Sequence, residues 1–196
     1  MDLGKAEALE PTDSEDRDHV LAFQSGKESG FNRLVLKHKD KIYGLCFRLL
    51  GDKDEADDAA QETFVKVFHG LADFRLEAKF STWVYRIAVN TCKNRMESKA
   101  YRESKNNKEL EASESDTNSS SPSPAQILEA KGRSACIEKA IERLADDQRV
   151  LIVLRDIEGR SYEEIAEVTG LNPGTVKSRL NRGRQQLQEW LRELWI

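Results

Sequence analysis

Residues 106–124 constrain the fold of this chain more than any other segment, because they cannot join a hydrophobic core. Their sequence, NNKELEASESDTNSSSPSP, contains one Leu and no aromatic residue. So little apolar surface cannot offset the entropy that a chain loses on ordering. We therefore expect a flexible linker at 106–124, between an N-terminal domain at 16–105 and a C-terminal domain at 125–196. The acidic residues 1–15 are predicted to form a disordered N-terminus.

The rest of the sequence has the periodicity of amphipathic helices. Apolar residues recur at steps of three and four across 31–49, and again across 53–70, where Phe64 and Phe68 are expected to face inward. Gly51 between them suits a helix C-terminus. The fold class is therefore predicted to be all-α, with two small helical domains joined by the linker. In the C-terminal domain we expect helices near 126–144, 146–157, 161–169 and 173–194.

Charge is distributed unevenly along the chain, although its net charge is only −4. Residues 75–105 hold eight Lys or Arg against three Asp or Glu, and residues 171–192 hold five against one. Residues 52–62 hold six acidic residues and one Lys. This pattern predicts two surfaces for polyanions and one surface for a basic partner.

Several functional classes are disfavoured by the composition. The sequence has no CxxC motif, no Gly-rich phosphate loop and no run of about 18 apolar residues. We therefore expect no catalytic residue, no metal, no other cofactor and no membrane insertion, and a cytoplasmic location. The cysteines and histidines, which are common metal ligands and catalytic residues, are too far apart in the sequence to suggest such a site. They are Cys46, Cys92, Cys136, His19, His38 and His69.

Residues 160–187, RSYEEIAEVTGLNPGTVKSRLNRGRQQL, have the spacing of a helix-turn-helix. Ser161 and Glu164 can form a capping box for the first helix. Gly170 permits the positive φ of the turn, and Asn172 followed by Pro173 favours the start of a second helix.

The second helix of this motif is expected to pack through Val176 and Leu180 against Ile165, with the small Ala166 allowing close approach. It then presents a polar and basic face that consists of Thr175, Lys177, Ser178, Arg179, Asn181, Arg182 and Arg184. Arg, Lys and Asn side chains on such a helix can read bases in the major groove and hold phosphates. DNA binding is therefore predicted, and the alternative is a helical hairpin whose basic face is merely solvated.

Residues 80–99, FSTWVYRIAVNTCKNRMESK, combine aromatic, amide and cationic side chains on one predicted helix. Aromatic rings stack on unpaired bases, amides pair with base edges, and cations hold the backbone. The preceding loop adds Phe74, Arg75 and Lys79, so that loop and helix could form a pocket for a base removed from the duplex. Trp83 fits a core position better than a base contact.

Three stretches, in this order, resemble the extracytoplasmic-function group of bacterial sigma factors: EADDAAQETFVKVF at 55–68, FSTWVYRIAVNTCKNR at 80–95, and the helix-turn-helix at 160–187. The resemblance covers nearly all of 20–194. It implies sigma region 2 in the N-terminal domain and sigma region 4 in the C-terminal domain. It also implies an alternative sigma factor that binds core RNA polymerase, directs it to specific promoters and helps to melt the minus-10 element.

The resemblance also implies roles for particular residues. Those matching positions that dock on the clamp helices of the largest polymerase subunit are Asp58, Gln61, Glu62, Phe64 and Lys66. Those matching positions near the flipped base and melted strand of the minus-10 element are Phe74, Tyr85, Arg86, Asn90, Lys93 and Asn94. Those matching positions that read or contact the minus-35 element are Arg155, Tyr162, Thr175, Lys177, Ser178, Arg179, Asn181 and Arg182.

The partners implied are core RNA polymerase, promoter DNA and an anti-sigma factor that covers both domains. Asn181 stands where relatives often carry an aromatic or apolar residue, so the resemblance does not imply a promoter sequence. The alternative function is a one-component transcription regulator with the same helix-turn-helix. That alternative requires a ligand-binding or phosphoacceptor domain, which 16–105 does not suggest.

Overall fold

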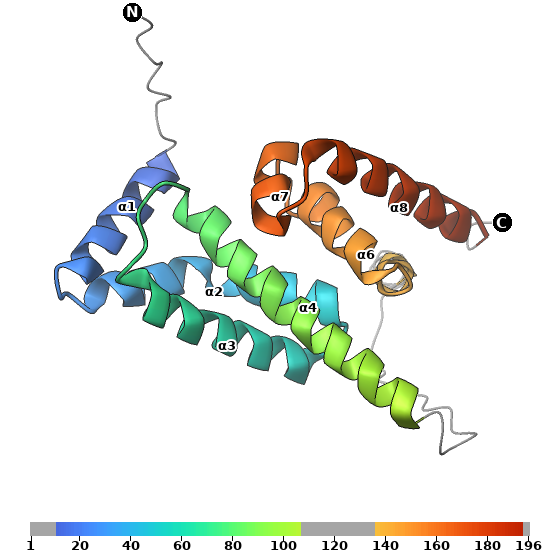
Figure 1. Ribbon diagram of the computed structural model, residues 1–196, viewed down its shortest axis with the longest axis horizontal. Coiled ribbons are helices and arrows are strands. Elements are labelled where there is room, and N and C mark those ends of the chain that lie inside the picture. The colour runs from blue at the N-terminus through green and yellow to red at the C-terminus, as the bar shows by residue number, and fades with distance from the viewer. Residues whose placement is uncertain (1–10, 107–135, 194–196) are drawn as a thin grey trace, which may run out of the picture.

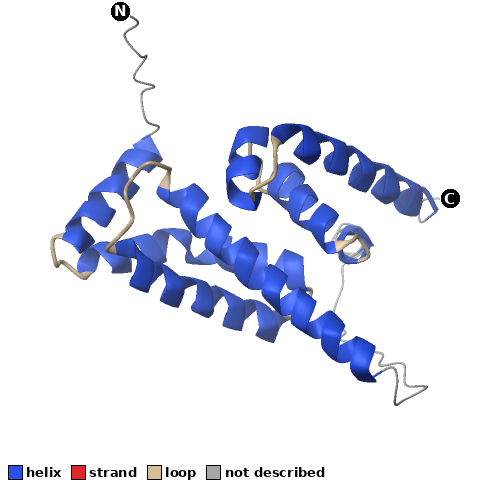
Figure 2. Ribbon diagram, in the orientation of Figure 1, coloured by secondary structure: helices blue, strands red, loops and turns tan. Residues whose placement is uncertain are grey.

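The computed structural model describes residues 11–106 and 136–193, and the regular structure of these residues is helical throughout (Figures 1 and 2). This confirms the predicted all-α fold class. The N-terminal module contains α1 (Pro11–Gln24), α2 (Ser29–Leu50), α3 (Lys53–Leu71) and α4 (Phe80–Asn106). The C-terminal module contains a helical segment at 136–142, then α6 (Asp146–Ile152), the π-helical turn η1 (Val153–Ile157), α7 (Tyr162–Thr169) and α8 (Pro173–Glu193). The predicted linker lies outside the described residues except for Asn106, as does the first part of the helix expected near 126–144.

The connection between α2 and α3 follows the local sequence signals. Gly51 takes the left-handed conformation with φ 73°, and its N–H donates to the carbonyl of Phe47 at 2.9 Å. Asp52 then caps α3 by accepting a hydrogen bond from the N–H of Glu55 at 2.9 Å. These two caps turn the chain back on itself, so that α3 packs along α2 (Figure 1).

Helix α4 completes the N-terminal module by packing across α2 and α3. Its buried side chains recur at helical spacing and face the apolar stripe of α2. The buried residues of the two helices include Leu34, His38, Ile42, Leu45, Cys46, Leu49, Val84, Tyr85, Ala88, Val89 and Cys92.

Helix α1 begins at Pro11, so residues 11–15 belong to a helix and not to the disordered N-terminus that we predicted; residues 1–10 lie outside the described part. Tertiary ion pairs explain the difference. Asp13 contacts the Nζ of Lys79 at 2.8 Å, and Glu15 contacts the Nζ of Lys37 at 3.0 Å. The sequence of this acidic segment alone predicts a solvent-exposed, disordered terminus. In the fold, however, its carboxylates pair with Lys79 and Lys37, which are far away in the sequence.

The two modules share one buried apolar cluster. Tyr85 and Met96 of α4 belong to the same cluster as Val150 of α6 and Leu154 of η1, and α7 packs against α4 (Figure 1). The C-terminal module therefore covers part of α4 in this structure. None of the described helices has the length and apolar character that crossing a bilayer requires.

Asp16 connects α1 to α2 through a buried ion cluster. Its carboxylate is 2.9 Å from Nε2 of His38 and 2.7 Å from Nζ of Lys37, and only 2% of the side chain is exposed. Burial acts to raise the pKa of Asp16, but the hydrogen bonds with His38 and Lys37 outweigh it, so that the pKa lies below its ordinary value of 3.8. The ionised carboxylate therefore stabilises the fold.

We expect Asp16→Asn to lower the free energy of unfolding by about 2–3 kcal/mol near pH 7, because it removes charge-assisted hydrogen bonds from a buried site. The folded-state pKa is depressed, so this stabilisation is present above the unfolded pKa and is lost as the pH falls below it. Urea denaturation should show the difference from the wild type shrinking below about pH 4. The control is Glu15→Gln, which alters the exposed neighbouring carboxylate and should change stability little. An equal loss in both variants would contradict this assignment.

Candidate functional site

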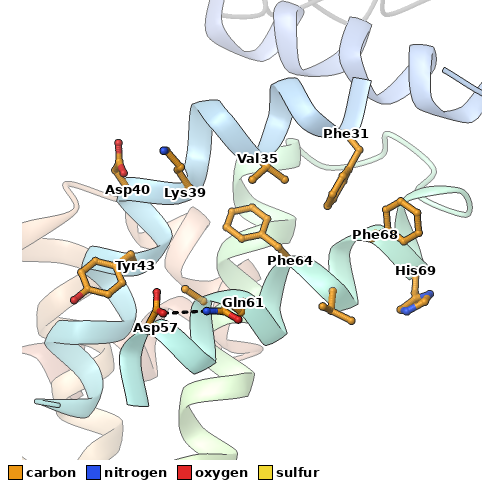
Figure 3. Close-up of a pocket in the computed structure, with 12 residues that line it drawn as sticks. Phe31, Val35, Lys39, Asp40, Tyr43, Asp57, Gln61, Phe64, Phe68 and His69 are labelled. Carbon is orange, nitrogen blue, oxygen red and sulfur yellow. Dashed lines mark hydrogen bonds between the residues drawn. The ribbon is translucent and has the colours of Figure 1, made fainter. Parts of the chain in front are cut away.

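A hollow of about 800 Å³ lies between α2 and α3 (Figure 3). Its apolar lining comes from Phe31 and Val35 of α2 and from Phe64, Val65 and Phe68 of α3. Phe64 is partly buried, whereas Val65 is 55% and Phe68 is 40% exposed. The expectation that Phe68 faces inward was therefore wrong. Phe68 packs edge-on against Phe23 and Phe31 at the end of the hollow and remains open to solvent.

Polar side chains border the same hollow. Lys39, Asp40 and Tyr43 lie along α2, and Asp57 faces Gln61 on α3, with Nε2 of Gln61 donating to Asp57 at 2.9 Å (Figure 3). An apolar floor with a polar rim is the usual anatomy of a protein-binding surface. We call this hollow the α2–α3 groove.

The neighbouring side of α3 carries an ion network centred on Arg95 of α4. Its guanidinium lies 2.8 Å from Glu55, 3.0 Å from Glu62 and 4.0 Å from Asp58. Burial acts to lower the pKa of Arg95, but the hydrogen bonds to Glu55 and Glu62 outweigh it and raise that pKa. The network therefore cross-links α3 to α4 and neutralises part of the acidic segment at 52–62.

Lys66 joins the same network, since its Nζ lies 2.7 Å from Glu62 and donates to Oγ1 of Thr91 at 3.0 Å. A hydrogen bond from Lys66 is the main reason why the pKa of Glu62 is lowered. The predicted polymerase-docking residues thus occupy two sides of α3. Gln61 and Phe64 line the α2–α3 groove, whereas Asp58, Glu62 and Lys66 face α4.

The loop before α4 holds an aromatic cluster. Phe74 stacks on Trp83 with ring centroids 4.6 Å apart and an angle of 25° between the planes, and Phe80 meets Phe74 edge-on. Trp83 is partly buried. One face of Phe74 is therefore already occupied by α4, and Trp83 acts as the support that positions the loop.

The other predicted minus-10 residues lie on α4 in different environments. Arg86, Asn90 and Asn94 are exposed and recur every four residues, so they share one face of the helix, and Lys93 lies beside them half-buried. Tyr85 is instead 1% exposed. Only part of the predicted set therefore forms an open surface in this structure.

Tyr85 contacts the C-terminal module with both its hydroxyl and its ring. The hydroxyl donates to Oε2 of Glu158 at 2.7 Å, and the guanidinium of Arg160 lies 4.1 Å from the ring centroid. Burial, together with the hydrogen bond to Glu158, raises the pKa of Tyr85 to about 12. This contact could not be foreseen, because Tyr85 and Glu158 are far apart in the sequence.

The helix-turn-helix adopts the predicted caps. Ser161 and Glu164 form a capping box, Gly170 ends α7 with φ 71°, and Asn172 accepts a hydrogen bond from the N–H of Thr175 at 2.8 Å. The packing residues expected between the two helices, Ile165, Val176 and Leu180, are fully buried.

The predicted minus-35 residues of α8 are mostly on its outer surface. Lys177, Ser178, Asn181 and Arg182 are exposed, and Thr175 and Arg179 are partly buried. Before the motif, Arg155 lies 4.8 Å from the ring of Tyr162 and donates to the carbonyl of Arg160 at 2.6 Å. Arg155 therefore lies near the N-terminus of α7 and helps to hold the loop that precedes this helix.

Sequence reasoning missed the α2 side of the groove. Phe31, Val35, Lys39 and Tyr43 recur every four residues, and this second stripe beside the buried one was a usable signal. Within residues 11–106 and 136–193, no group of His, Cys, Asp and Glu side chains is arranged to hold a metal ion.

Family models match both modules. The model for Sigma-70 region 2 matches residues 34–102, and that for Sigma-70 region 4 matches residues 134–187. The chain is 36% identical over 187 residues to the RNA polymerase sigma-H factor of Pseudomonas aeruginosa, covering 93% of this chain and 97% of that protein. It is also 36% identical over 184 residues to the ECF RNA polymerase sigma factor SigW of Bacillus subtilis, covering 89% and 96%.

The chain belongs to the extracytoplasmic-function (ECF) family of sigma factors, a family of transcription initiation factors. A solved structure of the sigma factor RpoE in complex with the anti-sigma factor NepR from Bartonella quintana aligns with a TM-score of 0.64 and 25% identity, over 83% of this chain and 96% of that one. In this sigma factor, the region 2 match contains most of α2, all of α3 and most of α4, and the region 4 match contains the helix-turn-helix.

We expect Asn172→Ala to lower the free energy of unfolding of region 4 by about 1 kcal/mol, because the first turn of α8 loses its side-chain cap. The control is Asn181→Ala, an exposed change in the middle of the same helix, which should be neutral or slightly stabilising because Ala favours helices. Chemical denaturation followed by circular dichroism measures both. A cap variant as stable as the control would show that the hydrogen bond to Thr175 contributes nothing.

Proposed function

We propose that this chain is an alternative sigma factor that binds core RNA polymerase, directs it to specific promoters and helps to melt the minus-10 element. The observation that carries the proposal is the presence of three different surfaces on one chain of this family. They are the α2–α3 groove, the exposed face of α4 with the Phe74 loop, and the basic face of α8.

The α2–α3 groove is the docking site that we propose for the clamp helices of the largest polymerase subunit. Its apolar floor offers Phe64 and Phe68 as anchors, and aromatic anchors in such grooves provide much of the affinity of protein interfaces. The acidic residues at 52–62 then favour a basic partner surface and increase the rate of association.

Region 4 is proposed to place α8 in the major groove of the upstream promoter element. Lys177, Asn181 and Arg182 are exposed on this helix and are suited to base edges and phosphates. Duplex DNA bound by this helix would align region 2 with the downstream element.

Region 2 is proposed to capture an unpaired base between the Phe74 loop and α4. Unstacking a base costs a few kcal/mol, and one aromatic stack returns about 1–3 kcal/mol. A single pocket therefore only balances the cost, and polymerase and phosphate contacts must supply the rest. Promoter binding by the free chain is expected to be weak and strongly dependent on salt.

We also propose that an anti-sigma factor controls this chain and that it acts in the cytoplasm, where polymerase meets the chromosome. The relative RpoE, which was solved in complex with NepR, supports the first part of this proposal. The rival function, a one-component regulator with the same helix-turn-helix, predicts no stable association with core polymerase. Co-purification with core polymerase and run-off transcription across a promoter library distinguish the two functions.

We expect Phe64→Ala to weaken binding to core polymerase about tenfold, because it truncates an anchor of the groove. The matched control is Leu36→Ala, which removes an apolar side chain of α2 that is 64% exposed and lies outside the groove. Surface plasmon resonance with immobilised core enzyme measures both, and circular dichroism verifies folding. Equal affinities for the two variants would rule out the groove as the docking site.

We expect Asn90→Ala to slow open-complex formation on a duplex promoter at least tenfold while leaving polymerase binding intact, because the exposed amide no longer pairs with an unstacked base. Permanganate footprinting with reconstituted holoenzyme measures melting. A promoter that carries a mismatched bubble at the minus-10 element should restore most of the activity. Wild-type melting by the variant would show that Asn90 is not part of the base pocket.

A further inference from the structure

Asp147 joins the two DNA-binding modules through a single carboxylate. It lies in the first turn of α6, where one oxygen is 3.0 Å from Nζ of Lys93 on α4 and the other contacts the guanidinium of Arg179 on α8. Lys93 is a predicted minus-10 contact and Arg179 a predicted minus-35 contact. One carboxylate therefore neutralises a cation from each proposed DNA-binding surface.

Glu158 makes a second connection between the modules. One of its oxygens accepts the hydroxyl hydrogen of Tyr85 at 2.7 Å, and the other lies 3.2 Å from the guanidinium of Arg48 on α2. The hydroxyl of Tyr85 is occupied by Glu158, and one face of its ring is covered by Arg160. Neither is therefore available to contact a base. The predicted minus-10 surface is therefore partly covered by region 4.

The contacts of Arg149 add a third link. This side chain donates to the carbonyl of Leu49 at the end of α2 at 2.8 Å, and to the carbonyls of Glu142 and Leu144 within its own module. The modules thus meet through specific polar contacts as well as through the shared apolar cluster.

We propose that the free chain holds its two DNA-binding surfaces closed on each other by an interdomain latch, in which Asp147 takes the place of a DNA phosphate on Lys93 and Arg179, and Glu158 holds Tyr85. The proposal rests on the proposed DNA-contacting roles of Lys93, Arg179 and Tyr85. A carboxylate and a phosphate compete for the same cations, so the chain must open before both surfaces can bind DNA. A polymerase-bound state that separates the modules would then expose both surfaces together.

The ion pairs of the latch are weak enough for the closed arrangement to be reversible. Half of the Asp147 side chain is exposed, and ion pairs as accessible as these contribute little individually. A hydrogen bond from Lys93, with further contributions from Arg179, holds the pKa of Asp147 below its ordinary value, so the carboxylate is charged at neutral pH. Binding energy from a larger partner surface can therefore open the latch, whereas DNA alone must compete with it.

The test compares two double variants of region 4 that make the same change in net charge. Asp147→Asn with Glu158→Gln removes the latch. Asp146→Asn with Glu163→Gln removes the neighbouring acidic residue of α6, whose ion pair is with Arg149 of the same helix, and an exposed acidic residue of α7. Any increase in DNA affinity that comes only from the lost negative charge appears equally in both.

Two measurements on the full-length chain decide the outcome. Small-angle X-ray scattering should give a larger radius of gyration for the latch variant than for the wild type and the control. Fluorescence anisotropy with a mixed-sequence single strand of about 20 nucleotides should show roughly two- to fivefold tighter binding by the latch variant than by the control at low salt. This gap in affinity should narrow as salt is added.

Equal radii for the latch variant and the control, or equal affinities, would overturn the proposal, as would a wild-type scattering profile of two separated modules. Tighter binding without a change in radius would also overturn it, because Arg179 would then be freed without any opening. Run-off transcription with core polymerase separates this failure from that of the proposed function. If the wild-type chain initiates transcription but the latch variant has the same scattering profile as the control, the latch is contradicted and the proposed function is not.

Discussion

The packing of α4 determines which surfaces of this chain remain available. One side of the helix is buried against α2 and α3, where Val84, Ala88 and Cys92 form part of the core. A second side meets region 4 through Tyr85 and Met96. The remaining face of α4 is exposed to solvent and carries Arg86, Asn90 and Asn94. A helix that packs on two neighbours has room for only one narrow functional face, so any gain in exposed surface requires movement of region 4.

The acidic segment of α3 shows how one helix can present two chemistries. Its i, i+4 series Asp58, Glu62 and Lys66 faces Arg95 and Thr91, so these charges are partly used in holding α3 to α4. The adjacent series, with Gln61, Phe64 and Phe68, faces α2 and borders the groove. The acidic residues of 52–62 therefore stabilise the packing of α3 on α4, and in the proposed docking they would also attract a basic partner, whereas the apolar stripe would provide the surface that the partner buries. Docking affinity is expected to depend more on the second stripe than on the first.

Local signals in the sequence predicted the helix boundaries well, because caps depend on neighbours a few residues away. Gly51, Ser161 with Glu164, Gly170 and Asn172 all adopt the expected geometry. Long-range contacts were beyond the same reasoning. Nothing near Pro11 indicates that Lys79 and Lys37 will neutralise α1, and nothing near Tyr85 indicates that Glu158 will accept its hydroxyl. The α2 side of the groove lies between these cases, because its apolar residues Phe31 and Val35 follow the same helical spacing as the core stripe and were assigned to it.

The distribution of ion pairs bears on the two proposed DNA-binding surfaces of a chain whose net charge is −4. Many of its basic side chains are held by carboxylates of another element: Arg95 by Glu55 and Glu62, Arg184 by Asp156, and Lys93 and Arg179 by Asp147. Such pairing suppresses non-specific attraction to DNA, which depends on the number of cations free to displace counterions. Pairs within one module persist when the modules separate, but the bond between Lys93 and Asp147 does not. Separation therefore changes the charge presented to DNA most strongly on α4, the surface where unpaired bases are proposed to bind. In the proposed mechanism, one movement of region 4 would therefore both open the chain and free Lys93 to bind the melted strand.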